Sequence, residues 1–352
     1  MSAIQDAKHI ALSYQATLDS AATEEIEDVL GEYLADDCLW RGMHPFYEQT
    51  GASAIANNFW KPLRTAFSPL QRRNDVFIAG NNDAGEHGSD ENDTGTADAT
   101  WVCSMGHFFG LFDKPFLDIP ATGKMVFIRY AEFLCISNNK IIDSAFFFDL
   151  IGIMQQADQY PLPPQTGAFF MHPGPRTHDG LLYEEQSTDS GVETMALVNR
   201  MVEDLRQLNI SGEDNCPPEL LAKCWADDMI WYGPTGIGST YTITRYQKQH
   251  QYPFREGLKD KVFNGHVARF AEGNYACFFG WANLTNSAKG GFLGLTGNET
   301  RADMRVVDVY RREGDKLAEN WVFIDLPHYL SMQGLDILDR MRRSLLPTSS
   351  QV

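Results

Sequence analysis

Two aspartates close two similar stretches of the sequence, and their surroundings suit acid/base chemistry. Residues 140–150 contain Asp149, and residues 316–326 contain Asp325 at the matching position. Both stretches are rich in β-branched and aromatic residues, a composition that predicts strands. A carboxylate among aromatic side chains loses hydration, which raises its pKa and makes it a candidate general base near neutral pH.

Other polar and aromatic residues stand where they are expected to assist this base. Arg129 and Arg305 match one another in the preceding predicted strands, and an arginine there suits a substrate carboxylate or an enolate. His44 follows the first predicted strand, near the expected opening of a pocket. We therefore expect catalytic roles for Asp149, Asp325, Arg129 and His44, and pocket roles for Trp40, Phe112, Phe147, His107, Trp231, Trp321 and Arg305.

Structural roles for the same residues are open alternatives. Asp149 is also placed to pair with Arg129, as a buried structural bridge, or to cap the helix that starts near Gly152. His328 closely follows Asp325 and is a candidate partner for it. His107 suits a core position as readily as a proton carrier in a pocket.

Composition and charge restrict the classes of function. The chain has 352 residues and a formal net charge of −18, which disfavours nonspecific binding to nucleic acid or to anionic membranes. No apolar run approaches the roughly 20 residues of a membrane span, and the first residues lack the pattern of a secretory signal. The 6 cysteines form no C-x-x-C pair. We therefore expect buried reduced thiols, no metal, no cofactor and a cytoplasmic location.

The sequence contains two similar copies of one domain. Residues 34–42 and 225–233 coincide at two adjacent aspartates, at Trp40 and Trp231, and at the closing glycine, which indicates an internal repeat. Each copy predicts helices, a strand, a helix and a run of antiparallel strands. This order is typical of an α+β cone, in which a curved sheet wraps on helices with a pocket between them.

The predicted organisation is a first domain at 1–158, a proline-rich linker at 159–190 and a second domain at 191–352. An acidic, glycine-rich segment at 81–95 predicts a mobile hairpin loop in the first domain only. We expect the two halves to form an internal pseudo-dimer, with further homo-oligomerisation left open.

The motif Ile119-Pro-Ala-Thr-Gly-Lys124, followed by Asp149-Leu-Ile-Gly-Ile-Met-Gln-Gln156, resembles the SnoaL-like polyketide cyclases. These belong to the nuclear transport factor 2-like (NTF2-like) superfamily. The resemblance implies two tandem NTF2-like cones, each with an apolar pocket. It also implies that the aspartate on the last strand, Asp149 or Asp325, acts as the acid/base.

Three features of this sequence depart from the family pattern. Phe112 occupies a position where family members often carry histidine, and Ala145 occupies one where many carry tryptophan, kept here as Trp321. In the second copy the Pro-Thr-Gly-Lys turn has become Leu295-Thr-Gly-Asn298.

The resemblance implies an acid/base enzyme that needs no cofactor and acts on a small, mostly apolar carbonyl compound, as a cyclase, isomerase or dehydratase. The alternative is a binding protein for small molecules that does not turn them over, which the replacement of the family histidine favours. No Ser-His-Asp spacing, phosphate loop or dinucleotide-binding glycine pattern is present.

Overall fold

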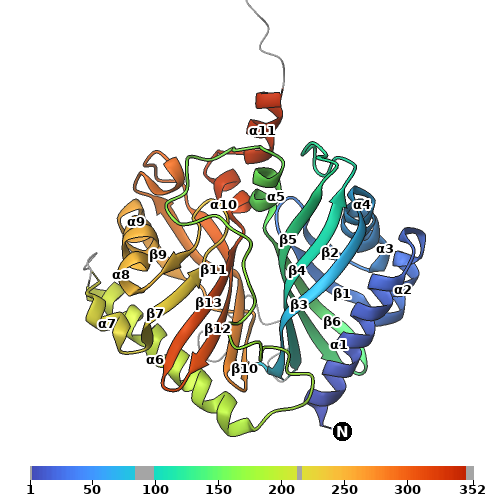
Figure 1. The fold of residues 1–352 in the computed structure, drawn as a ribbon, viewed down its shortest axis with the longest axis horizontal. Helices are drawn as coiled ribbons and strands as arrows, with labels where there is room; N and C mark the ends of the chain where they lie inside the picture. The colour runs from blue at the N-terminus through green and yellow to red at the C-terminus, as the bar shows by residue number, and fades with distance from the viewer. Residues whose placement is uncertain (1, 84–98, 212–215, 346–352) are drawn as a thin grey trace, which may run out of the picture.

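Two sheets face each other across the middle of the molecule, and each carries helices on its outer side (Figure 1). The structure is a computed structural model that describes residues 2–83, 99–211 and 216–345. Most of the acidic segment predicted to be a mobile hairpin therefore lies outside the described residues. Among those described, no helix is long and apolar enough to cross a membrane.

The first half builds a six-stranded sheet in the order β2-β1-β6-β5-β4-β3. Its strands are β1 (Leu34–Gly42), β2 (Tyr47–Thr50), β3 (Phe67–Asn81), β4 (Thr100–Phe112), β5 (Met125–Ser137) and β6 (Lys140–Phe148). Its helices are α1 (Ala3–Ser20), α2 (Ile26–Tyr33), α3 (Ala52–Ile55), a π-helical turn (Ala56–Trp60), α4 (Lys61–Ala66) and α5 (Leu150–Gln156).

The second half repeats this plan, with the order β10-β11-β12-β13-β7-β8 and β9 paired to β11. Its strands are β7 (Trp225–Tyr232), β8 (Thr240–Tyr241), β9 (Leu258–Phe263), β10 (Ala268–Glu272), β11 (Tyr275–Ala288), β12 (Ala302–Glu313) and β13 (Lys316–Ile324). Its helices are α6 (Thr188–Ser211), α7 (Pro218–Ala222), α8 (Ile243–Tyr246), a π-helical turn (Gln247–Gln251), α9 (Tyr252–Gly257), α10 (Leu326–Met332) and α11 (Ile337–Leu345).

The predicted fold class, two tandem α+β domains in which a sheet packs on helices, is confirmed. One detail differs, because neither sheet is wholly antiparallel. Strand β1 runs parallel to β6, and β7 runs parallel to β13. Helices and other strands connect each parallel pair, as parallel pairing requires.

The segment between α5 and α6 contains no helix or regular strand and runs between the two halves (Figure 1). It forms isolated bridges from Leu181 to Phe77 in the first half and from Ala168 to Ser239 in the second. Helix α6 begins at Thr188. The exact domain boundaries at 158 and 190 remain predictions.

The two faces of each sheet have different neighbours, because successive side chains of a strand alternate in direction. In β6, Phe146 lies 5.0 Å from Phe59 of the covering helices, whereas Phe147 lies 6.1 Å from Phe279 of the other half (ring centroids). We call the space between β1–β6 and α1–α4 the first cup, and that between β7–β13 and α6–α9 the second cup. The contact between the opposite faces of the two sheets is the junction.

The first cup is filled with aromatic rings. The ring centroid of Phe146 lies 5.0 Å from Phe59, 5.2 Å from Trp60 and 5.7 Å from Tyr130. All four side chains are buried. Contacts at these separations are those of a close-packed core, so the first cup is a hydrophobic core.

Replacing Phe146 by alanine should therefore lower the free energy of unfolding by about 3–5 kcal/mol, because it leaves a cavity among rings. The matched variant is Val322→Ala at the equivalent position of β13, where fewer atoms are removed and the loss should be smaller. Urea unfolding of both variants checks this expectation. Equal losses would contradict a tightly packed first cup.

Candidate functional site

Asp149 ends strand β6 and caps helix α5. Its Oδ1 accepts a hydrogen bond from the amide of Gly152 at 2.9 Å. Its Oδ2 accepts two more from Thr235 of the second half, from the amide at 3.0 Å and from the hydroxyl at 2.7 Å. The capping alternative is therefore confirmed, and the same carboxylate ties the two halves together. Its catalytic role remains a prediction.

Asp325 occupies the equivalent position and makes the reciprocal contact. Its Oδ1 accepts from the amide of His328 at 3.2 Å, and its Oδ2 accepts from the amide of His44 in the first half at 2.9 Å. Arg305 Nη1 lies 3.6 Å from the carboxylate. Burial raises the pKa of Asp325 to about 6, although Arg305 and the two amides pull the pKa down.

The structure groups the predicted catalytic residues differently from the sequence expectation. His44 lies against Asp325, not against Asp149, because the loop after β1 crosses to the other half. Arg129 donates to the carbonyls of Tyr232 at 3.0 Å and Gly233 at 3.3 Å. Arg129 thus binds backbone of the second half and forms no bidentate bridge with Asp149.

Several predicted pocket residues lie at the junction, outside either cup. Arg305 stacks over the ring of Trp281, 3.8 Å from its centroid. His107 Nδ1 lies 3.0 Å from Asp75 Oδ2, and its ring stacks on Phe127. Phe147 also faces the junction.

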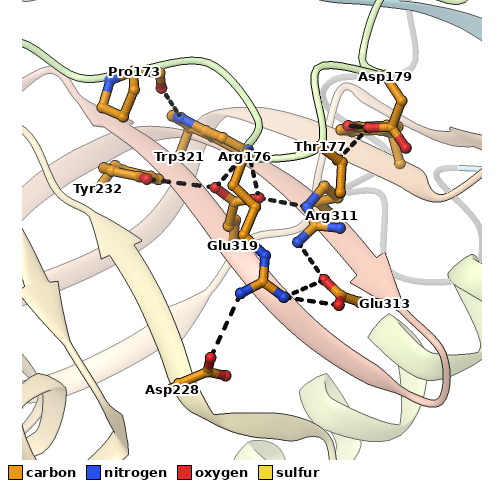
Figure 2. Close-up of polar contacts among 11 residues, drawn as sticks. Pro173, Arg176, Thr177, Asp179, Asp228, Tyr232, Arg311, Glu313, Glu319 and Trp321 are labelled. Atoms are coloured by element: carbon orange, nitrogen blue, oxygen red, sulfur yellow. Dashed lines mark hydrogen bonds and ion pairs between the residues drawn. The ribbon is translucent and has the colours of Figure 1, made fainter.

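Trp321 is covered by the segment that links the two halves (Figure 2). Its indole nitrogen donates to the carbonyl of Pro173 at 3.1 Å. Glu319, two residues earlier on the same face, pairs with Arg311 and accepts from the amide of Arg176 at 3.3 Å. This network fastens the linker to the second sheet, so Trp321 serves packing here.

Three predicted pocket residues do lie on the helix-facing sides. Trp40 contacts Phe59, and Phe112 contacts Phe67, with ring centroids 5.0 and 4.6 Å apart, in the filled first half. Trp231 is in the second cup, stacked on His250 at 4.0 Å. Of these three residues, only Trp231 lies in the second cup, where its neighbour is the polar ring of His250.

A small hollow opens at the junction beside Asp149, lined also by Thr235, Met43, Phe323 and Pro327. Its space for a water molecule amounts to about 10 Å³, the size of a single water site. The junction around Asp149 therefore offers no room for an organic substrate.

The Asp149–Thr235 contact should contribute measurably to stability. Thr235→Val removes a hydrogen bond to a charged group, which typically costs about 1.5–3 kcal/mol. Urea unfolding measures the loss, with the exposed Thr244→Val as the matched control, expected within about 0.5 kcal/mol of the wild type. If Thr235→Val left the free energy of unfolding unchanged, this contact would not hold the halves together.

The second cup differs from the first on its sheet side, where three aromatic side chains of the first cup have aliphatic counterparts. The positions of Tyr130, Phe146 and Phe148 are taken by the smaller Val306, Val322 and Ile324. Polar rings have replaced apolar side chains elsewhere on the same lining: Tyr246 stands for Ile55, and His250 stands for Phe59.

Solvent reaches the lining of the second cup. Five of its side chains are partly exposed, whereas their five equivalents in the first cup are buried. The partly exposed residues are Tyr246, His250, Phe254, Val306 and Asp308, and their buried equivalents are Ile55, Phe59, Leu63, Tyr130 and Glu132. The lining of the second cup is therefore more exposed to solvent than that of the first cup, which is a packed core.

Glu132 and Asp308 occupy equivalent positions in the two cups but have different partners. Glu132 accepts from Arg72 Nη1 at 2.9 Å and from Gln15 Nε2 at 2.9 Å. The position of Arg72 in the second half is Phe263, as the strand pairing shows. Among the described residues Asp308 makes no ion pair, so its carboxylate keeps its charge without a cation beside it.

Asp308 is instead surrounded by neutral polar groups. Tyr310 donates its hydroxyl at 3.1 Å and Asn320 its amide at 3.2 Å, both to Oδ1. Burial raises the pKa of Asp308 to about 6, and these two hydrogen bonds pull it down. Burial and then the charge of Asp308 raise the pKa of Tyr246, so that its hydroxyl stays protonated.

Our sequence analysis missed Asp308. The alignment of Glu132 with Asp308 was available from the repeat, and so was the replacement of Arg72 by Phe263. Only the ion pair of Arg72 with Glu132 in the structure shows that Asp308 lacks this partner. Among the described residues, no group of three or more His, Cys, Asp or Glu side chains could hold a metal ion.

The unpaired carboxylate should cost stability at high pH. Because folding raises its pKa from 3.8 to about 6, the ionised form destabilises the folded state above about pH 6. Asp308→Asn should therefore raise the free energy of unfolding at pH 8, and the gain should shrink as the pH falls through 6 and vanish near 4. Urea unfolding at several pH values checks this; a loss of stability at pH 8 would assign Asp308 a structural role.

Comparison with known proteins shows that part of the first half is similar to one family. Residues 91–157 match the sequence model described as SnoaL-like polyketide cyclase. The resemblance read from the Pro-Ala-Thr-Gly-Lys and Asp149 motifs is thereby confirmed over this stretch. No curated protein matches the sequence.

Three of the solved structures that match cover less than half of this chain but almost all of their own chains. A SnoaL-like protein from Jannaschia sp. CCS1 is 19% identical, with 47% of this chain and 98% of that chain covered and a TM-score of 0.32. An NTF2-like protein from Burkholderia xenovorans LB400 is 13% identical, with 41% and 98% covered and a TM-score of 0.32. TsrD from Streptomyces laurentii is 14% identical, with 43% and 97% covered and a TM-score of 0.33.

Proposed function

We propose that the protein is an acid/base enzyme for a small, mostly apolar carbonyl compound, with the second cup as its active site and Asp308 as its base. One observation carries the proposal. Asp308 lies in the second cup, whose lining is partly exposed to solvent. It lacks the arginine that neutralises the equivalent Glu132 in the first cup. Retaining an unpaired carboxylate at this position costs stability, which is explained if the carboxylate is used in catalysis.

The chemistry follows from the groups around Asp308. Its ionised carboxylate takes a proton from the carbon next to a carbonyl group. The electron pair of the C–H bond forms a C=C bond, and the π electron pair of the carbonyl group moves onto its oxygen. The hydroxyl of Tyr246, which no described residue engages in a hydrogen bond, donates to the oxygen as its charge develops. Asp308 then returns the proton to the product.

Three outcomes are consistent with an enolate formed in this way. Returning the proton to a different carbon gives an isomerisation. Expulsion of a hydroxyl group, which takes the proton from Asp308 and leaves as water, gives a dehydration. Attack of the enolate carbon on a second carbonyl group, whose oxygen takes the proton from Asp308, gives a ring closure. None of these steps requires a cofactor. The resemblance to SnoaL-like cyclases favours ring closure, whereas the geometry supports only the shared first step.

Turnover tests the assignment of the base. Native mass spectrometry with a panel of aromatic and terpenoid ketones follows both binding and the mass or structure of the released compound. Asp308→Asn should bind the same ketone and return it unchanged, while the matched variants Asp149→Asn and Asp325→Asn are assayed beside it. If only Asp325→Asn lost turnover, the base would be Asp325 at the junction, in line with the family resemblance.

The pH dependence gives a second test. Because the base must be ionised, kcat/KM should rise as the pH passes about 6 and level off above it. Steady-state rates between pH 4.5 and 8 measure this profile. A rate that falls with rising pH over this range would exclude an ionised carboxylate as the base.

Binding without turnover is the second candidate function, and the replacement of the family histidine by Phe112 favours it. A ketone that binds to the wild type and to Asp308→Asn equally, and that is returned unchanged by both, would establish it.

A further inference from the structure

The second cup has a second polar end, away from Asp308, where two buried polar atoms lack hydrogen-bond partners among the described residues. His250 Nδ1 and Thr240 Oγ1 are buried atoms with no hydrogen-bond partner among the described residues. Burying such a group without a hydrogen bond is costly, and buried polar groups in proteins are nearly always satisfied by protein or water. Two such unpartnered groups in one cup require an explanation.

Both groups lie beside Trp231. The His250 ring stacks on Trp231 with centroids 4.0 Å apart and planes 15° from parallel. Thr240 pairs directly with Trp231 in the register of β7 and β8, so both side chains point into the second cup. The first cup has no counterpart, because the equivalent residues are Phe59 and Gln49, and Gln49 donates to the carbonyl of Phe46.

Tyr246 lies between this polar end and Asp308. Its ring centroid is 5.5 Å from His250 and 5.7 Å from Trp231. Burial and then the charge of Asp308 raise the pKa of its hydroxyl group. The cup thus presents a carboxylate with a tyrosine at one end, flat rings in the middle, and an imidazole with a hydroxyl at the other end.

The chemistry of the two unpartnered groups selects one kind of ligand group. Burial lowers the pKa of His250 to about 3, so the ring is neutral at physiological pH and one of its nitrogens accepts a hydrogen bond. The threonine hydroxyl both donates and accepts. A hydroxyl group on the ligand can donate to the imidazole and accept from Thr240 at the same time, which neither a carbonyl oxygen nor a methyl group can do.

We propose that the second cup is built for a compound with two oxygen functions, a carbonyl group held at Asp308 and Tyr246 and a hydroxyl group held at His250 and Thr240. The flat apolar body between them lies along Trp231. This inference rests on the proposed function and extends it by naming the substrate class. The hydroxyl-binding end takes no part in proton transfer and serves to select and orient the ligand.

Two matched pairs of probes test the inference: acetophenone with 4-hydroxyacetophenone, and 2-acetylnaphthalene with 6-hydroxy-2-acetylnaphthalene. Dissociation constants are measured by isothermal titration calorimetry with the full-length chain. The wild type should bind the hydroxylated member of at least one pair roughly tenfold more tightly or better, because the compound without the hydroxyl leaves two buried groups unpaired.

His250→Phe is the decisive variant, since it installs the residue of the first cup. It should abolish the preference for the hydroxylated probe while the parent ketone still binds. Thr240→Val gives the same test should His250→Phe fold poorly, as judged by thermal unfolding. Asp308→Asn is the control at the other end and should keep the preference.

The outcomes separate this inference from the proposed function. Equal binding of both members by the wild type, or a preference that survives in both His250→Phe and Thr240→Val, overturns the hydroxyl site and leaves Asp308 as a candidate base. Failure of all four ketones to bind overturns both proposals. Loss of turnover in Asp308→Asn concerns the base alone and does not bear on the hydroxyl site.

Discussion

The exchange of aspartates between the two halves organises the molecule. Asp149 and Asp325 each end the last strand of a sheet, cap the helix that follows and accept a hydrogen bond from the loop after the first strand of the other half. Each carboxylate is thus fixed by its own half and by the opposite one. The contact is reciprocal, as in a two-fold symmetric dimer, although both copies belong to one chain.

This arrangement fixes which face of each sheet is available for function. The faces that carry the two aspartates pack on each other and on the linker, which Glu319 and Trp321 hold in place (Figure 2). Only the helix-facing sides remain. One set of contacts at the junction holds the halves together, so the two cups can differ. The first cup is a core of close-packed rings, whereas the second is polar and accessible to solvent.

Much of the fold follows from local patterns in the sequence. The repeat of Trp40 and Trp231, the strand endings at Asp149 and Asp325, and the helix positions are all visible there. A period of two cannot tell which of the two faces meets the helices, because both are rich in aromatic residues. The expected pocket was therefore assigned to the face that forms the junction.

The site depends on pairs of residues that are distant in sequence. That Arg72 neutralises Glu132 is decided by the pairing of β3 with β4 and of β4 with β5, which no local pattern reveals. The absence of this partner at Asp308 becomes meaningful only when the two halves are compared strand by strand. The unpartnered groups of His250 and Thr240 likewise emerge from packing around Trp231.

The central claim is that the second cup, and not the first, holds the ligand, because three sheet residues that are aromatic in the first cup are aliphatic in the second. The most direct measurement is the dissociation constant of 4-hydroxyacetophenone for two mirrored variants. Val322→Phe puts back the ring of the first cup, and Phe146→Val removes it from the first cup. The account predicts that Val322→Phe abolishes binding and that Phe146→Val, once shown to be folded, binds as the wild type does. Unchanged binding by Val322→Phe, or loss of binding confined to Phe146→Val, would contradict it.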